Sequence, residues 1–200
     1  GVSEYIATDL NNIGLMHHLQ GQYEEAIEHY QESLAIDRKL GKKDTSITLN
    51  NIGMVYRVWG RYEKAMEYFQ QGLDMNRKLG NEAETAINFS NIGLVYGAWG
   101  QYDKAIENFK KALEVNRKFG RQGSVPTNLN NIGMIHQKWG QYDKAISIFQ
   151  QALTIQRNLD SKNMIETLLG NIGEAHFRQG RYDKAMEYYQ RGLAIARKLG

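Results

Sequence analysis

Apolar residues recur along the chain with a helical period, and the whole pattern returns every 39 or 40 residues. Across residues 82–99 they follow the i, i+3, i+4, i+7 spacing of one helix face, as Phe89, Ile92, Gly93 and Tyr96. Residues 102–119 carry a second stripe, formed by Ala105, Phe109, Ala112 and Leu113. Each repeat is therefore predicted to contain two amphipathic helices, named helix A and helix B in chain order.

Two glycines mark the same positions in every repeat. The first lies inside helix A, at Gly14, Gly53, Gly93, Gly133 and Gly173. A glycine inside a helix costs about 1 kcal/mol relative to alanine, so five copies indicate a close approach of helices A and B. The second lies seven residues later, at Gly21, Gly60, Gly100, Gly140 and Gly180. It is predicted to end helix A with a positive φ.

Five copies at a fixed period predict an all-α solenoid of helix-turn-helix repeats, with ten antiparallel helices in a single domain spanning residues 1–200. The expected repeats are approximately 2–41, 42–80, 81–120, 121–160 and 161–200. Helix A is predicted to be capped by Asp44 or Thr45 in repeat two, Ser124 in repeat four and Ser161 in repeat five.

The order Leu/Phe, Ile, Gly, Tyr/His, Gly, Tyr, Ala, Phe/Tyr, small residue, Leu resembles the tetratricopeptide repeat over essentially the whole chain. The period of 40 differs from the usual 34, and arginine replaces the proline that usually closes helix B, at Arg38, Arg77, Arg117, Arg157 and Arg197. The longer helices resemble those of kinesin light chain, of LGN/Pins scaffolds and of prokaryotic signalling proteins. This resemblance implies a right-handed superhelix, helices A on its concave side, and a protein- or peptide-binding role.

Composition narrows the function further. The chain has 42% hydrophobic residues, no cysteine and a net charge of +3 that is spread over every repeat. No apolar run approaches the roughly 20 residues that span a bilayer. We therefore expect a cytoplasmic protein that binds neither membrane nor nucleic acid. The sequon Asn88-Phe89-Ser90 falls mid-helix and is interpreted as a chance match.

Catalytic and metal-binding patterns are not found in the sequence. His17, His136 and His176 occupy the register that Tyr56 and Tyr96 fill in other repeats, so they are expected in the core. The other two histidines have no ligand partner at i, i+4. The glycines never cluster into a phosphate loop. The sequence thus predicts no enzyme, no cofactor and no metal site.

Two further rows have competing interpretations. Trp59, Trp99 and Trp139 end helix A in the inner repeats and are expected to pack against the following repeat, or else to form an exposed binding row. The five arginines lie in the last turn of helix B, where they complement the helix dipole by roughly 0.3–1 kcal/mol. The alternative, a basic ladder for nucleic acid, is opposed by neighbouring acids such as Asp74 and Glu114.

The most informative row precedes the Ile-Gly pair and is asparagine in every repeat: Asn12, Asn51, Asn91, Asn131 and Asn171. In three repeats a second asparagine precedes it: Asn11, Asn50 and Asn130. A carboxamide donates and accepts at once, which suits a peptide backbone. In the resembling families the corresponding asparagine commonly contacts bound peptide. The alternative is a hydrogen bond to a neighbouring helix, and the two roles can coexist.

An apolar row lies three residues beyond the asparagines, at Leu15, Met54, Leu94 and Met134, and breaks to Glu174. Basic residues follow one turn later, at Arg57, Lys138 and Arg178. We therefore predict a scaffold whose groove binds a protein or peptide with apolar anchors and mild acidity. The alternatives are a homo-oligomer that stacks end to end through uncapped terminal repeats, and the sensor arm of a larger signalling protein.

Overall fold

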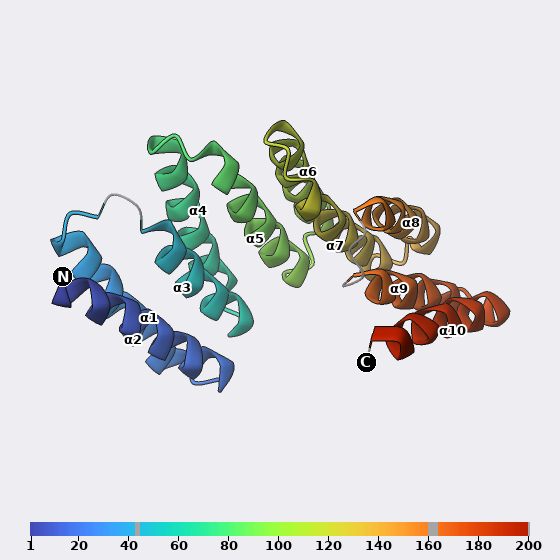
Figure 1. Ribbon diagram of the computed structural model, residues 1–200, viewed down its shortest axis with the longest axis horizontal. Coiled ribbons are helices and arrows are strands. Elements are labelled where there is room, and N and C mark those ends of the chain that lie inside the picture. Colours follow the sequence, from blue (N-terminus) through green and yellow to red (C-terminus); the bar gives the residue numbers. More distant parts are fainter. Residues whose placement is uncertain (43–44, 160–163, 200) are drawn as a thin grey trace. The chain divides into compact units, whose positions relative to one another are not determined.

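The structure, a computed structural model, describes residues 1–42, 45–159 and 164–199. In this part of the chain all regular elements are helical (Figure 1). The A helices are α1 (Val2–Leu19), α3 (Ser46–Val58), α5 (Thr85–Ala98), α7 (Val125–Lys138) and α9 (Ile165–Arg178). The B helices are α2 (Tyr23–Lys39), α4 (Tyr62–Lys78), α6 (Tyr102–Lys118), α8 (Tyr142–Asn158) and α10 (Tyr182–Leu199). Single 3₁₀ turns, η1 (Glu82–Glu84) and η2 (Gln122–Ser124), precede α5 and α7.

The chain divides into two compact units, Gly1–Gly100 and Gln101–Gly200. The first contains α1 to α5 and the second α6 to α10. Within each unit every helix packs against the next one along the chain. The A helices of consecutive repeats also touch one another, α1 with α3, α3 with α5 and α7 with α9. The all-α repeat architecture is confirmed, whereas a single right-handed superhelix stays a prediction.

The turn between helices A and B depends on the second glycine. Gly60 has φ +78°, a conformation that a residue with a Cβ rarely adopts. The N–H of the next residue, Arg61, donates to the carbonyl oxygen of Tyr56 at 2.8 Å, the long bond of a Schellman motif. The other four glycines of this row also have φ between 72° and 78°, so the prediction is confirmed in all five repeats.

The first glycine is where helices A and B meet most closely. A Cβ added at Gly53 would lie 2.7 Å from the Phe69 ring, and one added at Gly14 would lie 3.1 Å from the ring of Tyr30. Gly133 and Gly173 have the same relation to the next B helix. The predicted close approach is therefore confirmed at these four positions, where an aromatic ring of helix B takes the space of the missing side chain.

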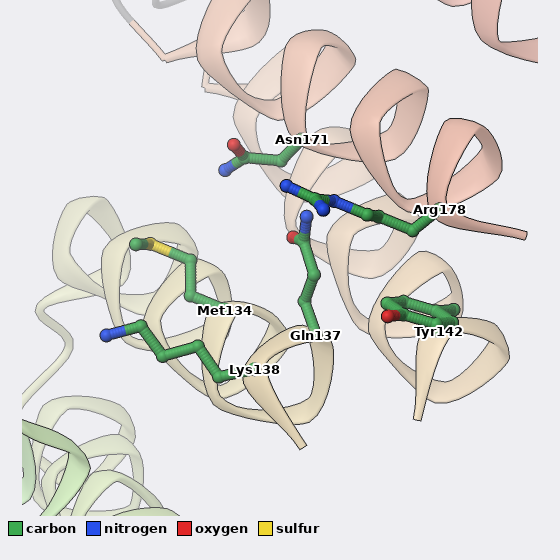
Figure 2. A pocket seen from close by; sticks show the side chains of 6 residues that line it. All are labelled: Met134, Gln137, Lys138, Tyr142, Asn171 and Arg178. Carbon is green, nitrogen blue, oxygen red and sulfur yellow. The ribbon is translucent and has the colours of Figure 1, made fainter. Parts of the chain in front are cut away.

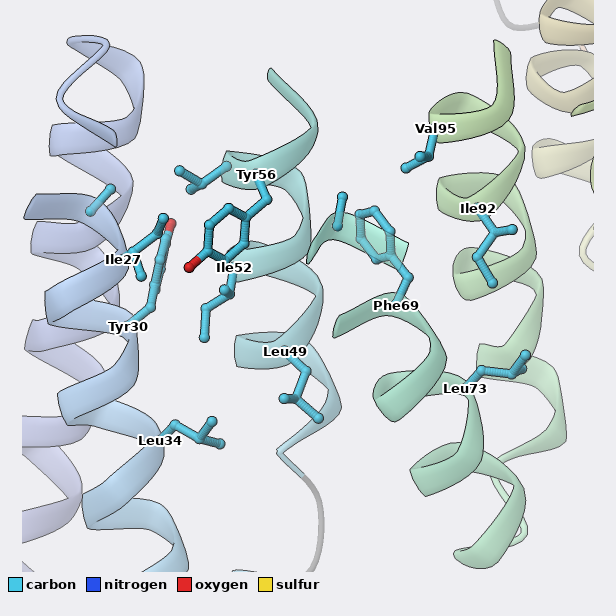
Figure 3. Close-up of a cluster of buried hydrophobic side chains, with 13 residues drawn as sticks. Ile27, Tyr30, Leu34, Leu49, Ile52, Tyr56, Phe69, Leu73, Ile92 and Val95 are labelled. Carbon is cyan, nitrogen blue, oxygen red and sulfur yellow. The ribbon is translucent and has the colours of Figure 1, made fainter. Parts of the chain in front are cut away.

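One core runs without a break from α2 to α5 in the first unit (Figure 3). Each of these four helices contributes a stripe, for example Leu34 from α2, Ile52 from α3, Phe69 from α4 and Val95 from α5. Ile52, Phe69 and Val95 are fully buried. No single hairpin encloses these side chains, so each repeat depends on its neighbour for stability.

Three local predictions need correction. Thr45 and Ser124 are N-cap residues, but neither side chain makes a capping hydrogen bond. Thr45 instead directs Oγ1 to Sδ of Met75 at 3.4 Å. The third correction concerns the predicted start of helix A near Glu82, where a 3₁₀ turn comes first and α5 begins at Thr85. Asp44 and Ser161 lie outside the described residues.

The tryptophan row packs in the direction opposite to the one predicted. Each indole contacts the tyrosine that begins helix B of the preceding repeat, in the pairs Tyr23–Trp59, Tyr62–Trp99 and Tyr102–Trp139. Their ring centroids are 5.8–5.9 Å apart. The expectation of packing against the following repeat was wrong because the end of one A helix lies beside the start of the previous B helix.

The last helix, α10, has an apolar face that the described residues leave largely uncovered. Tyr182, Met186 and Leu193 are 64%, 58% and 50% exposed. At the same register in α8, Ile146 and Leu153 are 8% and 5% exposed because α9 covers them. The predicted exposure is confirmed, and association of copies through this face stays a prediction.

Candidate functional site

A hollow of about 410 Å³ opens on the A-helix face of the second unit. Its lining comes from α7, α9 and the start of α8: Met134, Gln137, Lys138, Tyr142, Asn171 and Arg178 (Figure 2). Four of these six residues belong to the predicted groove. The other two, Gln137 and Tyr142, were missed, although Gln137 follows Met134 by three residues and so lies on the same helix face.

The asparagines of consecutive A helices are joined by hydrogen bonds. Nδ2 of Asn171 donates to Oδ1 of Asn130 at 2.7 Å, across α9 and α7. Nδ2 of Asn51 donates to Oδ1 of Asn11 at 3.4 Å, across α3 and α1. At these two positions the structural interpretation of the row is confirmed: the amide nitrogen links a repeat to the one before it.

For the remaining members of the row, no side-chain hydrogen bond to a described residue is found. Asn91 and Asn131 are half-buried, and neither side chain hydrogen bonds to any residue that the structure describes. Asn12 is exposed. A half-buried carboxamide has lost part of its hydration, so a hydrogen-bonding partner stabilises it. Asn91 and Asn131 can therefore offer both a donor and an acceptor to a bound chain.

The preceding asparagines, by contrast, serve the scaffold. Nδ2 of Asn11 donates to the hydroxyls of Ser33 and Thr48, the latter at 3.2 Å. Oδ1 of Asn50 accepts a hydrogen bond from Asn88 at 3.0 Å, and Asn88 in turn accepts one from Asn76 at 2.8 Å.

Asn88 is also the sequon residue, and it is 0% exposed inside α5. Its carboxamide already takes part in two hydrogen bonds within the first unit. No glycan can be accommodated on this side chain in the folded chain, which agrees with the sequon being a chance match.

Beside the asparagines, the apolar row remains accessible. Leu15, Met54 and Met134 are 42%, 36% and 41% exposed, and Leu94 is half-buried. The row breaks at Glu174, as the sequence indicates. Its carboxylate accepts a hydrogen bond from the hydroxyl of Tyr189 at 3.1 Å. The apolar surface available to a ligand is therefore greatest on α1, α3 and α7.

The three basic residues have different environments. Arg178 is paired with Glu174 at 2.7 Å. Arg57 is half-buried, and burial lowers its pKa. Burial also lowers the pKa of the neighbouring His18, and the charge of Arg57 lowers it further. Lys138 is exposed and forms no ion pair with the described residues, which leaves it as the free cation beside the hollow.

The histidine prediction holds for one residue of three. His176 is 6% exposed and stacks on Tyr188. His17 and His136 are only half-buried. Nδ1 of His17 is hydrogen-bonded to Oε1 of Gln22 at 2.7 Å, and Nδ1 of His136 to Oε1 of Gln141 at 2.9 Å. Among the described residues, no cluster of histidine and carboxylate side chains could hold a metal ion. Nor is any helix in this part of the chain both long and apolar enough to cross a membrane.

These features define a class of protein. The tetratricopeptide repeat model matches residues 5–78 and 124–198, and a second model of the same repeat matches residues 87–119. The chain belongs to the tetratricopeptide repeat family, whose fold is generally a non-catalytic scaffold for protein–protein interaction. No curated protein matches the chain.

Solved structures show the same fold at low identity. BtubC (BKLC) from P. vanneervenii has a TM-score of 0.83 and 20% identity over 98% of this chain and 82% of its own. A putative kinesin light chain repeat protein of Podosopora anserina has a TM-score of 0.78 and 18% identity over 100% and 98%. A Rap protein complexed with Competence and Sporulation Factor has a TM-score of 0.78 and 21% identity over 94% and 53%. This chain thus spans about half of that Rap protein.

Proposed function

We propose that the A-helix face of each unit binds an extended peptide segment of a partner protein. The observation that carries this proposal is a half-buried carboxamide in each unit, Asn91 in the first and Asn131 in the second, neither with a partner among the described residues. The alternating N–H and C=O groups of an extended backbone match a carboxamide that can donate and accept. Apolar side chains of the ligand would contact Met54 and Met134, which lie one turn beyond the asparagine row.

The charge on this face indicates the chemistry of the ligand. Lys138 is exposed beside the hollow of the second unit and forms no ion pair with the described residues, and Arg178 lies opposite it with its charge partly neutralised by Glu174. A carboxylate in the ligand would pair with Lys138. The preferred segment is therefore mildly acidic with apolar anchors. The complex of a Rap protein with Competence and Sporulation Factor supports binding to a fold of this kind.

Peptide display tests the proposal. A random peptide library is selected on the wild-type chain, and the affinity of a selected peptide is measured by calorimetry for Asn91→Ala and Asn131→Ala, singly and together. Each lost pair of hydrogen bonds is worth about 1.4 kcal/mol, so at least one single variant should bind about tenfold more weakly. Because neither side chain bonds to the scaffold, helical content should not change.

Asn158→Ala is the matched control, since Asn158 is exposed at the end of α8. It should bind the peptide like the wild type. If the double variant kept full affinity, the asparagine row would not be the binding surface. Selection of no peptide at all would argue against the proposal as well.

Self-association is the second hypothesis, and the exposed apolar face of α10 favours it. Met186 and Leu193 are half exposed there. Light scattering over a range of concentrations tests it, with Met186→Lys as the variant. A mass that rises with concentration for the wild type but not for the variant supports association, and a constant monomer mass refutes it.

A further inference from the structure

In repeats one, two and five, helices A and B are joined by a pair of stacked rings. Tyr56 of α3 stacks on Tyr68 of α4 with centroids 5.5 Å apart and planes 23° apart. His176 of α9 stacks on Tyr188 of α10 at 5.5 Å and 24°. His17 and His29 form the same pair in repeat one, at 5.2 Å. This register therefore carries a ring on both helices in repeats one, two and five, whereas helix B has Asn108 in repeat three and Ile148 in repeat four.

The tyrosine of this pair also bonds to the preceding B helix. Nε2 of Gln31 on α2 donates to the hydroxyl oxygen of Tyr68 at 3.3 Å. Nε2 of Gln150 on α8 donates to the hydroxyl oxygen of Tyr188 at 3.5 Å. In repeats two and five, the phenol ring of the B-helix tyrosine therefore stacks on a ring of helix A, and its hydroxyl oxygen accepts a hydrogen bond from the preceding B helix.

Repeat four lacks this phenol. Ile148 stands at the register of Tyr68 and Tyr188, and Lys110 stands at the register of the two glutamines. His136 keeps the ring on the A helix. A hollow of about 530 Å³ lies at this place, and Lys110, His136 and Ile148 all line it. The phenol that fills the equivalent space in repeats two and five is therefore missing from a site whose other parts are present.

The walls of this hollow suit an aromatic ring. Leu113, Leu129 and Ile132 line it from α6 and α7 and are 6%, 5% and 3% exposed, so they form a fixed apolar floor. The imidazole of His136 is oriented by the bond from Nδ1 to Gln141 at 2.9 Å. An offset-stacked ring pair contributes roughly 0.5–1.5 kcal/mol beyond the area that it buries.

The rim supplies the polar end. Lys110 is exposed, and no described residue forms an ion pair with it. Its ammonium can donate a hydrogen bond, as the carboxamide of Gln31 does to Tyr68 of repeat two. Glu114 and Arg117 follow on the same face of α6 and complete a polar border around the apolar floor. A polar border around an apolar centre is the usual arrangement at a protein–protein contact.

We propose that this hollow between α6, α7 and α8 is a docking site for a tyrosine side chain of a partner protein. The ring would stack on His136, and the hydroxyl oxygen would accept a hydrogen bond from Lys110. The site uses none of the asparagines of the A-helix face, so it goes beyond the function proposed above and does not depend on it.

A titration followed by NMR tests this site on the whole chain. The probes are N-acetyl-L-tyrosinamide and, as a ring-free control, N-acetyl-L-leucinamide. The δ1-methyl resonance of Ile148 should move upfield with the tyrosine probe, because a bound ring shields it, and should move much less with the leucine probe. Equal shifts with the two probes would overturn the proposal.

Variants locate the binding. Ile148→Tyr restores the ring of the repeat register, so the shift of the His136 imidazole with the tyrosine probe should be lost. Thr154→Tyr adds a ring at an exposed position of the same helix and should bind the probe normally. Circular dichroism of Ile148→Tyr checks that it folds. Undiminished binding by this folded variant would refute the site.

A second variant keeps the test decisive even if Ile148→Tyr misfolds. Tyr68→Ile should open an equivalent hollow in repeat two, beside Tyr56 and Gln31. It should therefore create an additional tyrosine-specific site that shifts the resonances of Tyr56. If no such shift appeared, the argument from the repeat register would be wrong. Variants at Asn91 and Asn131 should leave both sites unaffected.

Discussion

Gly133→Ala tests whether the close approach of helices A and B is the reason for the glycine inside each A helix. The new Cβ would lie 2.6 Å from Cδ1 of Phe149, a ring that is 0% exposed and has no free space to move into. Overpacking of this kind costs about 1–3 kcal/mol. Alanine also gains about 1 kcal/mol of helix propensity, which partly offsets that cost.

Gly170→Ala separates the two effects. Gly170 lies in α9, within the same unit, and a Cβ at this position would meet open space, with no neighbouring atom within 4 Å. This variant should therefore gain about 1 kcal/mol from propensity alone. Because the propensity gain is common to both variants, their difference in unfolding free energy isolates the overpacking, about 1–3 kcal/mol.

Urea unfolding followed by helical circular dichroism measures this difference. A double-mutant cycle of Gly133→Ala with Phe149→Leu should show a favourable coupling of about 0.5–3 kcal/mol, because the smaller side chain relieves the clash. If the Gly133→Ala variant were as stable as the Gly170→Ala variant, the packing argument would be refuted. The glycine row would then need another explanation.

Three further predictions concern buried polar groups. Tyr30→Phe should stabilise the chain by about 1 kcal/mol in urea unfolding, because the buried hydroxyl of Tyr30 has no hydrogen-bond partner among the described residues. Burial also raises the pKa of this hydroxyl. Asn88→Ala should destabilise it by about 2 kcal/mol or more in the same assay, because Asn50 and Asn76 lose their bonds to it. Burial lowers the pKa of His176, so the unfolded chain binds the proton first as pH falls below about 6.5. Unfolding free energy should therefore decrease between pH values of about 7.5 and 5.5, and His176→Gln should reduce that decrease.

Much of the fold could be predicted because it repeats. The glycines at Gly53 and Gly60 indicate a close contact and a helix end, and five copies exclude coincidence. The direction of the Trp59 contact could not be predicted, because a register position does not say which neighbouring helix is closer. The missing side-chain cap at Thr45 has a similar origin: its hydroxyl is directed to a sulfur 30 residues away in the chain.

The candidate site was predictable to a lesser extent. Repetition singled out the asparagine row, yet it could not say that Asn171 is bonded to Asn130 while Asn131 has no partner among the described residues. That distinction depends on distances between side chains of neighbouring helices. Departures from the repeat proved as informative as the repeat itself, since Ile148 is an ordinary apolar residue until it is compared with Tyr68 and Tyr188.

The side-chain amide resonances of Asn91 and Asn131 test the central claim most directly. In an NMR titration with a peptide selected by display, the Nδ2 protons of at least one of them should shift as they form hydrogen bonds to the peptide backbone. The resonance of exposed Asn158 should not move. If the peptide bound while the amides of Asn91 and Asn131 stayed unchanged, the proposed binding face would be contradicted.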